Sequence, residues 1–122
     1  MRQTLARVEV LAELSLARLG WRAVPPPREA PEASEADIRR ALALAARVHH
    51  VAQVLGLQQA CLPRATALHH LLKRRGIPSG FRLGSRLTNG RLESHAWVEL
   101  GGRVVLGDLP DLETYRPFEV AD

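Results

Sequence analysis

Two short turn signals constrain the fold of this chain more than any other feature of its sequence. Asn89-Gly90 and Gly101-Gly102 each stand between runs of strand-forming residues. Such pairs are typical of two-residue β-hairpin loops. They predict a three-stranded antiparallel meander over residues 80–108. If Gly101 and Gly102 form the loop, paired positions sum to 203, and His95 lies directly opposite Asp108 on one face of the sheet.

The first segment, residues 3–20, has the apolar spacing of an amphipathic helix that ends at Gly20. We expect the charged Glu9 and Glu13 to lie off the apolar face of this helix. That broad apolar face comprises Leu5, Val8, Leu11, Ala12, Leu16 and Leu19.

Two more helices are predicted before the sheet. One begins at the capping-box-like Ser34 and ends at Gly56. The other covers residues 62–75, with Pro63 in its first turn. A proline-rich segment around Pro25-Pro26-Pro27 makes a stiff spacer ahead of them. Helices followed by a sheet indicate the α+β class.

The length of 122 residues suits one domain, residues 1–122, in which 1–33 form the N-terminal helix and the proline-rich linker. The hydrophobic content of 46% is in the globular range. The tail, 109–122, contains two prolines, so we expect it to be irregular or to add one short final strand.

Charge and cysteine content limit the partners and the compartment. The net charge of +4 is spread along the chain, and Lys73-Arg74-Arg75 is the single basic run. We therefore expect no nucleic-acid partner. One cysteine cannot form an internal disulfide, which suits a reducing compartment. No segment resembles a signal peptide or reaches transmembrane length. We expect a cytoplasmic protein without a membrane span.

Cys61, the single cysteine, stands at the start of the third predicted helix. Free backbone N–H groups and the helix dipole stabilise a thiolate at such a position. His95 would accept the thiol proton and later protonate a leaving amine. Asp108, opposite His95, would orient the imidazole. These three residues are the predicted catalytic set of a thiol hydrolase, whereas the alternative for Cys61 is a small buried hydrophobic residue.

The sequence leaves the roles of several residues near this catalytic set undecided. Asp111 competes with Asp108, and a bulge in either strand would reopen that choice. Gly84 should lie opposite His95, where a glycine leaves room for a peptide or marks a bulge. Trp97 shares the face of His95 and either shields the ion pair from water or fills the core. Gly84 and Trp97 are the substrate-lining candidates.

Three groups are candidates for stabilising an oxyanion: the backbone N–H of Cys61 and the side-chain amides of Gln58 and Gln59. For the glutamines, a solvated loop position is favoured over this role. The adjacent histidine pairs at 49–50 and 69–70 point about 100° apart on a helix, so neither pair chelates well. We expect no metal site and no cofactor.

Three stretches carry a resemblance to a known family: CLPRATAL from Cys61, LLKRRGI from Leu71 and HAWVELGG from His95. In these stretches, and over nearly its whole length, the chain resembles the lasso-peptide leader peptidases. These are transglutaminase-like cysteine proteases. The stretch Ala65-Thr66-Ala67 departs from the usual Ser-Leu-Ala without touching the predicted catalytic set.

The resemblance implies a papain-like or transglutaminase-like core, with the cysteine on a helix and His and Asp on adjacent strands. It implies cleavage of a ribosomally made precursor peptide, which frees the core N-terminus for the lasso cyclase, a further candidate partner. The chain begins directly at the protease-type helix, so it resembles the split form that lacks a leader-recognition domain. In that form a separate small protein binds the leader.

Two other functions remain open from the residues alone. A transglutaminase-like amidase or acyltransferase would use the same thiol with an amine acceptor in place of water. A noncatalytic peptide-binding module would keep Cys61 as a structural residue. For a leader-binding partner, the first helix and the strand edge near 81–87 are the candidate docking surfaces. The alternative for that edge is that the tail covers it.

Overall fold

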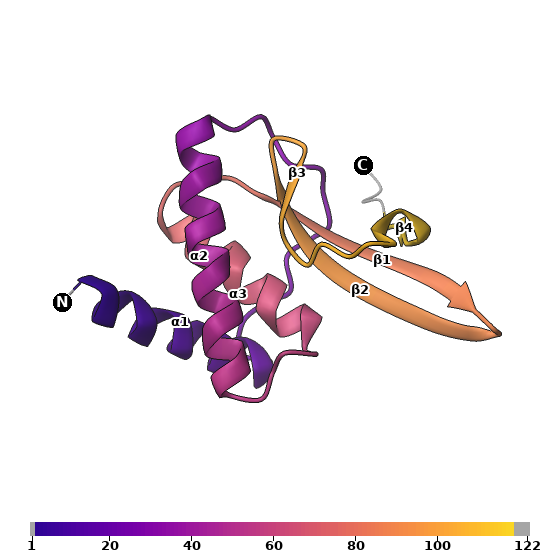
Figure 1. Cartoon of the computed structure of the whole chain (residues 1–122), viewed down its shortest axis with the longest axis horizontal. Coiled ribbons are helices and arrows are strands. Elements are labelled where there is room, and N and C mark those ends of the chain that lie inside the picture. Colours follow the sequence, from indigo (N-terminus) through magenta and orange to yellow (C-terminus); the bar gives the residue numbers. More distant parts are fainter. Residues whose placement is uncertain (1, 119–122) are drawn as a thin grey trace.

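Three helices gather at one end of the molecule, and a long β-hairpin extends away from them (Figure 1). The computed structural model describes residues 2–118. The helices are α1 (Arg2–Arg18), α2 (Glu35–Val54) and α3 (Cys61–Arg74). The strands are β1 (Gly80–Thr88), β2 (Arg91–Leu100), β3 (Arg103–Leu106) and β4 (Arg116–Pro117), with a 3-10 helix, η1 (Leu112–Thr114), before β4. The predicted α+β class is confirmed.

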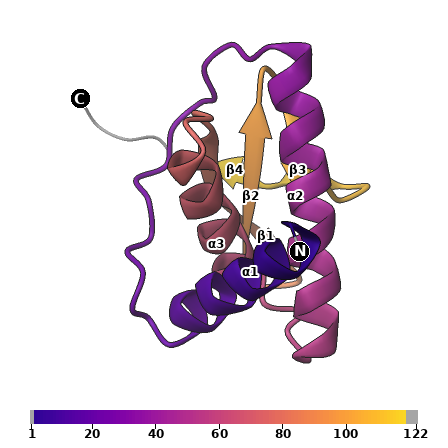
Figure 2. The same ribbon diagram turned by 90° about the vertical axis from the view of Figure 1, so that its left-hand side faces the viewer.

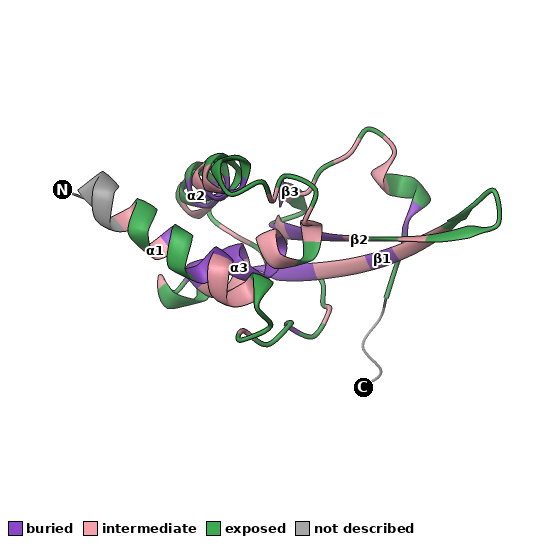
Figure 3. Cartoon of the chain, turned by 90° about the horizontal axis from the view of Figure 1, so that it is seen from below, coloured by how far each residue is buried: buried purple, intermediate pink, exposed green. Residues whose placement is uncertain are grey.

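The sheet has the antiparallel order β3-β2-β1-β4. Asn89, with φ 51°, and Gly90, with φ 78°, form the predicted two-residue turn. The β1–β2 register places Gly84 opposite His95, so this prediction is confirmed. The hairpin tip is exposed, whereas its other end packs under the helices (Figure 3).

The core lies between the helices and the near half of the sheet. Ser34 caps α2 by accepting a hydrogen bond from the N–H of Asp37 at 3.1 Å, as the sequence predicted. Figure 2 shows α1 crossing α2 and α3, with the linker running along the side of α3. The largest fully buried apolar side chains are Leu14, Leu68, Leu71, Leu72, Ile77, Phe81 and Leu100. None of the described helices is long and apolar enough to cross a membrane.

Both the linker and the tail cover the free edge of β1. The N–H of Arg28 donates to the carbonyl of Phe81 at 3.0 Å. At the other end β4 pairs with Gly84 and Ser85, and the N–H of Phe118 donates to the carbonyl of Leu83 at 2.7 Å. An edge with occupied backbone groups cannot accept another strand there. The candidate docking edge near 81–87 is therefore covered at Phe81 by the linker and at 83–85 by the tail. Residues 119–122 of the tail lie outside the described residues.

The helix α1 faces the core with the opposite side from the one predicted. It buries Val10, Glu13 and Leu14, whereas Val8 and Leu11 are exposed. The side chain of Leu5, also assigned to the apolar face, lies outside the described part of the structure. The reason for the reversal is a set of ion pairs between α1 and the end of α3.

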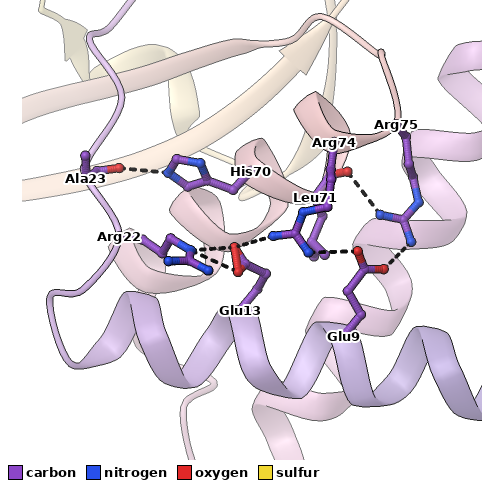
Figure 4. Close-up of polar contacts among 8 residues, drawn as sticks. All are labelled: Glu9, Glu13, Arg22, Ala23, His70, Leu71, Arg74 and Arg75. Carbon is purple, nitrogen blue, oxygen red and sulfur yellow. Dashed lines mark hydrogen bonds and ion pairs between the residues drawn. The ribbon is translucent and has the colours of Figure 1, made fainter.

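Two glutamates of α1 point into this contact (Figure 4). Glu9 pairs with Arg74 at 3.0 Å and with Arg75 at 2.5 Å. Glu13, only 1% exposed, pairs with Arg22 at 2.9 Å and with Arg74 at 3.0 Å. Burial alone would raise the pKa of Glu13, but the hydrogen bonds and charges of Arg22 and Arg74 outweigh it, so the pKa is lowered. The arginines thus keep a buried carboxylate ionised.

We expect Glu13→Gln to destabilise the protein by about 2 kcal/mol, because two charge-assisted hydrogen bonds are lost. Both arginines reach water, which keeps the cost below that of a fully buried pair. A carboxylate with a lowered pKa stabilises the fold above its ordinary pKa of 4.5, and this contribution is lost as the pH falls through the lowered value. Urea unfolding at pH 7 and at pH 3 measures both effects. Glu32→Gln, at an exposed linker position, is the matched control and should change neither curve.

Candidate active site

Cys61 is the first residue of α3, as the sequence predicted to within one position. Ala60 provides no side-chain cap for the helix. The thiol is partly exposed, so it is not a residue of the closed core. Its own N–H donates to the carbonyl of Gln59 at 3.1 Å, whereas the N–H of Leu62 has no partner among the described residues. The free donor of the first turn is therefore that of Leu62.

His95 lies on β2, and its orientation is set by the backbone. Its Nε2 lies 2.6 Å from the carbonyl oxygen of Gly107. A carbonyl only accepts hydrogen bonds, so Nε2 carries the hydrogen in this contact. In the neutral ring, Nδ1 is then the basic nitrogen. His95 is thus held in a tautomer that can take a proton at Nδ1.

Two aromatic side chains pack against this imidazole, which also lines a cavity. Trp97 stacks on His95 with 5.9 Å between ring centroids and 18° between planes. Tyr115, which is buried, lies 5.5 Å from it in a tilted arrangement. Trp97 is itself 3% exposed, and its Nε1 donates to Glu99 at 2.8 Å. Trp97 therefore shields His95 from water.

The space over Gly84 is taken by the protein itself. A Cβ there would lie 3.0 Å from the Trp97 ring and 3.0 Å from the Arg116 carbonyl. Gly84 is needed so that the indole and β4 can approach the strand. Of the two alternatives for Gly84, the structure supports neither directly, since the Trp97 ring and β4 occupy the space beside it.

The β2–β3 register contains the bulge that the sequence left open. Leu100 pairs with Arg103 and Glu99 with Val104, as predicted, but Val98 then pairs with Leu106. Val105 is the extra residue, and the ladder ends at the pair of Val98 with Leu106. The prediction that β3 continues to a direct pair of His95 with Asp108 is wrong.

Asp108 is exposed, and no hydrogen bond joins it to His95 among the described residues. It does line a cavity of about 430 Å³ together with His95, Gly107 and Arg64. Its other lining residues are mostly apolar and come mainly from α2 and β3, including Leu42, Ala45, Val105 and Leu106, and His49 of α2 also lines it. The fold thus brings His95 and Asp108 to one open cavity beside α3.

Asp111 is engaged elsewhere. Its carboxylate accepts a hydrogen bond from Arg86 at 2.5 Å. This bond is the main reason that the pKa of Asp111 is lowered, and the charge of His95 contributes less. The Arg86 guanidinium also lies over the Tyr115 ring, 4.3 Å from its centroid. Asp111 therefore supports the aromatic wall behind His95.

Arg64 is a residue that sequence reasoning missed, although it stands inside the CLPRATAL stretch. It follows Cys61 by one helical turn and is partly buried. Its Nη1 donates to the carbonyl of Gln58 at 2.7 Å, which ties the loop before Cys61 to the helix. Gln58 and Gln59 are both exposed, and no described contact fixes their side-chain amides. The structure thus favours the solvated position for these two glutamines.

Gly107 was also missed, and its position explains how His95 is held. Its φ is +88°, and a Cβ there would lie 2.8 Å from the Ala96 carbonyl and 2.9 Å from the Trp97 Cβ. Only glycine allows this close approach to β2. The approach places the Gly107 carbonyl on His95. The positive φ cannot be read from the sequence, but a glycine directly before Asp108 was a usable signal.

We expect Gly107→Ala to destabilise the fold by about 3 kcal/mol, because the strain of a positive φ and the steric clash of the new Cβ with β2 both raise the free energy of the folded state. Turnover should fall as well, since the carbonyl moves away from His95. Gly102→Ala is the matched control, because Gly102 has φ +80° but a Cβ at that position would meet nothing within 4 Å. Gly102→Ala should lower the free energy of unfolding by about 1 kcal/mol and leave kcat unchanged. Urea unfolding and kcat measured on both variants test this, and equal kcat in the two would contradict it.

A second cavity, of about 440 Å³, lies at the other end of α3 and contains none of the predicted site residues. His69 lines it and lies 3.3 Å from the Ser79 hydroxyl. Burial, with the nearby charges of His70, Lys73 and Arg28, lowers the pKa of His69 to about 4. His69 is therefore neutral at physiological pH. No group of three or more potential metal-binding side chains occurs in the part of the chain that the structure describes.

The fold and the site define a class of α+β protein with a cysteine at a helix start and a histidine on an adjacent sheet. Comparison with family profiles agrees with this class. Residues 6–120 match the transglutaminase-like superfamily, so the chain belongs to this superfamily. No curated protein and no solved structure matches it.

Proposed function

We propose that this chain is a cysteine peptidase that removes the leader from a lasso-peptide precursor and frees the core N-terminus for cyclisation. The orientation of His95 is the main support, because its Nε2 is held by Gly107 and its Nδ1 is left as the base. Membership in the transglutaminase-like superfamily supports thiol chemistry. The three stretches that begin at Cys61, Leu71 and His95 support the leader-peptidase assignment.

In the proposed reaction, His95 Nδ1 takes the proton of the Cys61 thiol, and the thiolate attacks the scissile carbonyl. The N–H of Leu62, unpaired among the described residues, is the backbone candidate for stabilising the oxyanion. The protonated His95 then gives its proton to the leaving amine, which is the new N-terminus of the core peptide. Water hydrolyses the thioester and restores the thiol. Asp108 would stabilise the imidazolium across the cavity.

Among the described residues, no hydrogen bond joins the Cys61 thiol to His95, and Cys61 is not one of the residues that line the cavity beside His95. Catalytic hydrogen bonds are often long without substrate and shorten in the complex. We infer that the bound peptide completes the site. A separate small protein that binds the leader would help, because tethering raises the local concentration of the cleavage site to about the millimolar range.

Mass spectrometry of a candidate precursor tests this function directly. The precursor is incubated with the chain, with and without its leader-binding protein, and Cys61→Ala serves as the control. Cleavage at the leader–core junction by the wild-type chain supports the proposal, and the rate should rise as the leader-binding protein is titrated in. A product joined to an added amine would instead show acyl transfer. An intact precursor in all samples would argue against peptidase activity.

A further inference from the structure

The helix α1 presents an apolar face to solvent. Glu9 and Glu13 turn inward toward the arginines of α3 (Figure 4). The residues on the opposite side of α1 therefore face outward. Val8 is 58% exposed, Leu11 42% and Leu19 63%. These positions are three, eight and eleven residues apart, which places them on one side of a helix. We call this set, with Ala12, the outer stripe of α1.

A further exposed aromatic residue follows the end of the helix. Trp21 is 74% exposed, and its N–H donates to the carbonyl of Leu16 at 2.8 Å. This bond holds the backbone of Trp21 beside the last turn of α1. Monomeric proteins seldom expose several large apolar side chains along one helix, and contiguous patches of this kind mark interaction surfaces. Tryptophan is among the residues that contribute most to binding at such surfaces.

The charges around the outer stripe are basic. Arg7 and Arg18 are exposed, and neither forms an ion pair with another residue that the structure describes. Arg7 also lines a pocket of about 290 Å³ between α1 and α2, together with Arg47 and His50. The described residues that line this pocket include no carboxylate. A ligand segment that covers the stripe would therefore gain from carboxylates placed near Arg7 and Arg47.

The basic residues around the outer stripe indicate which kind of binding partner could cover it. A second copy of the chain would bring its own Arg7 and Arg18 to the contact, and like charges across an interface are unfavourable. An extended strand cannot add along most of the edge of β1, because the linker and β4 occupy it at Phe81 and at 83–85. An amphipathic helix with one apolar side and acidic flanks matches both the stripe and its basic border.

We propose that the outer stripe of α1 is the docking surface for an acidic amphipathic segment of the leader-binding protein. The identity of this partner depends on the proposed function, whereas the chemistry of the surface does not. The site of docking lies away from Cys61, which stands at the opposite end of α3 from the arginines that hold α1. The pocket that contains Arg7 and Arg47 shares Ala46 with the cavity beside His95, so a segment docked there would lie next to that cavity along α2.

Binding is measured by titration calorimetry with Cys61→Ala protein and the leader-binding protein from the same biosynthetic cluster, so that no cleavage occurs. We expect Leu11→Glu and Leu19→Glu each to weaken binding at least tenfold. Arg7→Gln with Arg47→Gln should weaken it several-fold at low salt and little at about 0.5 M salt. The matched control is Leu87→Glu at the hairpin tip, where Leu87 is 73% exposed, and it should bind like the parent protein. Thermal unfolding of each variant checks that the fold is kept.

Wild-type affinity in Leu11→Glu and Leu19→Glu would overturn the proposal, and so would a parent protein that does not bind. Sedimentation of the chain alone that shows a dimer lost in Leu11→Glu would also overturn it, in favour of a second copy. A short peptide that spans the cleavage site and lacks the leader separates this result from the proposed function. Cleavage of that peptide without partner binding refutes only the docking surface, whereas partner binding without any cleavage refutes only the peptidase.

Discussion

Replacing Cys61 with alanine is expected to abolish precursor cleavage, with a loss of about four orders of magnitude or more in kcat. The thiolate is the nucleophile of the proposed reaction, and no other cysteine occurs in the chain to take its place. Cys61 is partly exposed at the start of α3 and makes no side-chain hydrogen bond within the described residues, so the fold should be kept. The measurement is cleavage rate by mass spectrometry at saturating precursor.

The adjacent Leu62→Ala is a suitable control, because Leu62 is 37% exposed on the same helical turn and its N–H remains in the variant. It should reduce the rate only slightly. Substantial cleavage by Cys61→Ala would show that the thiol is not the nucleophile and would leave the peptide-binding module as the better interpretation. Circular dichroism of both variants separates lost chemistry from lost structure.

Asp108→Asn is expected to lower kcat by about 10–100-fold, and Asp111→Asn to lower it less than about threefold. Removing the acid of a catalytic triad lowers kcat by about 10⁴-fold where that acid alone controls the tautomer of the histidine. Here the Gly107 carbonyl already controls the tautomer, so Asp108 contributes mainly through its charge beside the imidazolium. Asp111 is bound to Arg86 and supports the wall behind His95.

Steady-state kinetics of the two variants across pH 5–8 measures this ranking. The charge of Asp108 should matter most where His95 must become protonated, so Asp108→Asn should change the pH profile of kcat, whereas Asp111→Asn should keep its shape. A larger loss in Asp111→Asn would mean that Asp111 leaves Arg86 and turns to His95 in the substrate complex. The third catalytic role would then belong to Asp111.

The strands and helices were predictable because local residues determine their limits. Asn89-Gly90 sets the β1–β2 register, and the capping hydroxyl of Ser34 marks the start of α2. The bulge at Val105 was not predictable, because Val104, Val105 and Leu106 are all apolar strand formers. A run of this kind looks the same with or without an extra residue. The pairing of Asp108 therefore could not be derived by counting.

The prediction of which side of α1 is buried was wrong for a different reason. Apolar spacing predicts which side of a helix is buried when burial of apolar area dominates. In this chain Arg74 and Arg75, more than sixty residues further along, bind Glu9 and Glu13 and bury the acidic side instead. The buried side also carries Val10, Leu14 and Ala17 at helical spacing, but this apolar face is narrower than the one predicted, so the ion pairs decide between the two sides. The same contact leaves Val8, Leu11 and Leu19 at the surface.

The bond between His95 and the Gly107 carbonyl has a consequence for how proteins of this superfamily diverge, if they share the proposed chemistry. A carbonyl belongs to the main chain, so it persists whatever side chains replace its neighbours. Descendants of this chain could exchange or lose the acidic residue after Gly107 and still hold the imidazole in its working tautomer. Their shared signature would be a glycine with positive φ beside the histidine strand, not a third catalytic amino acid. A search for relatives that requires an aspartate at this place would overlook them.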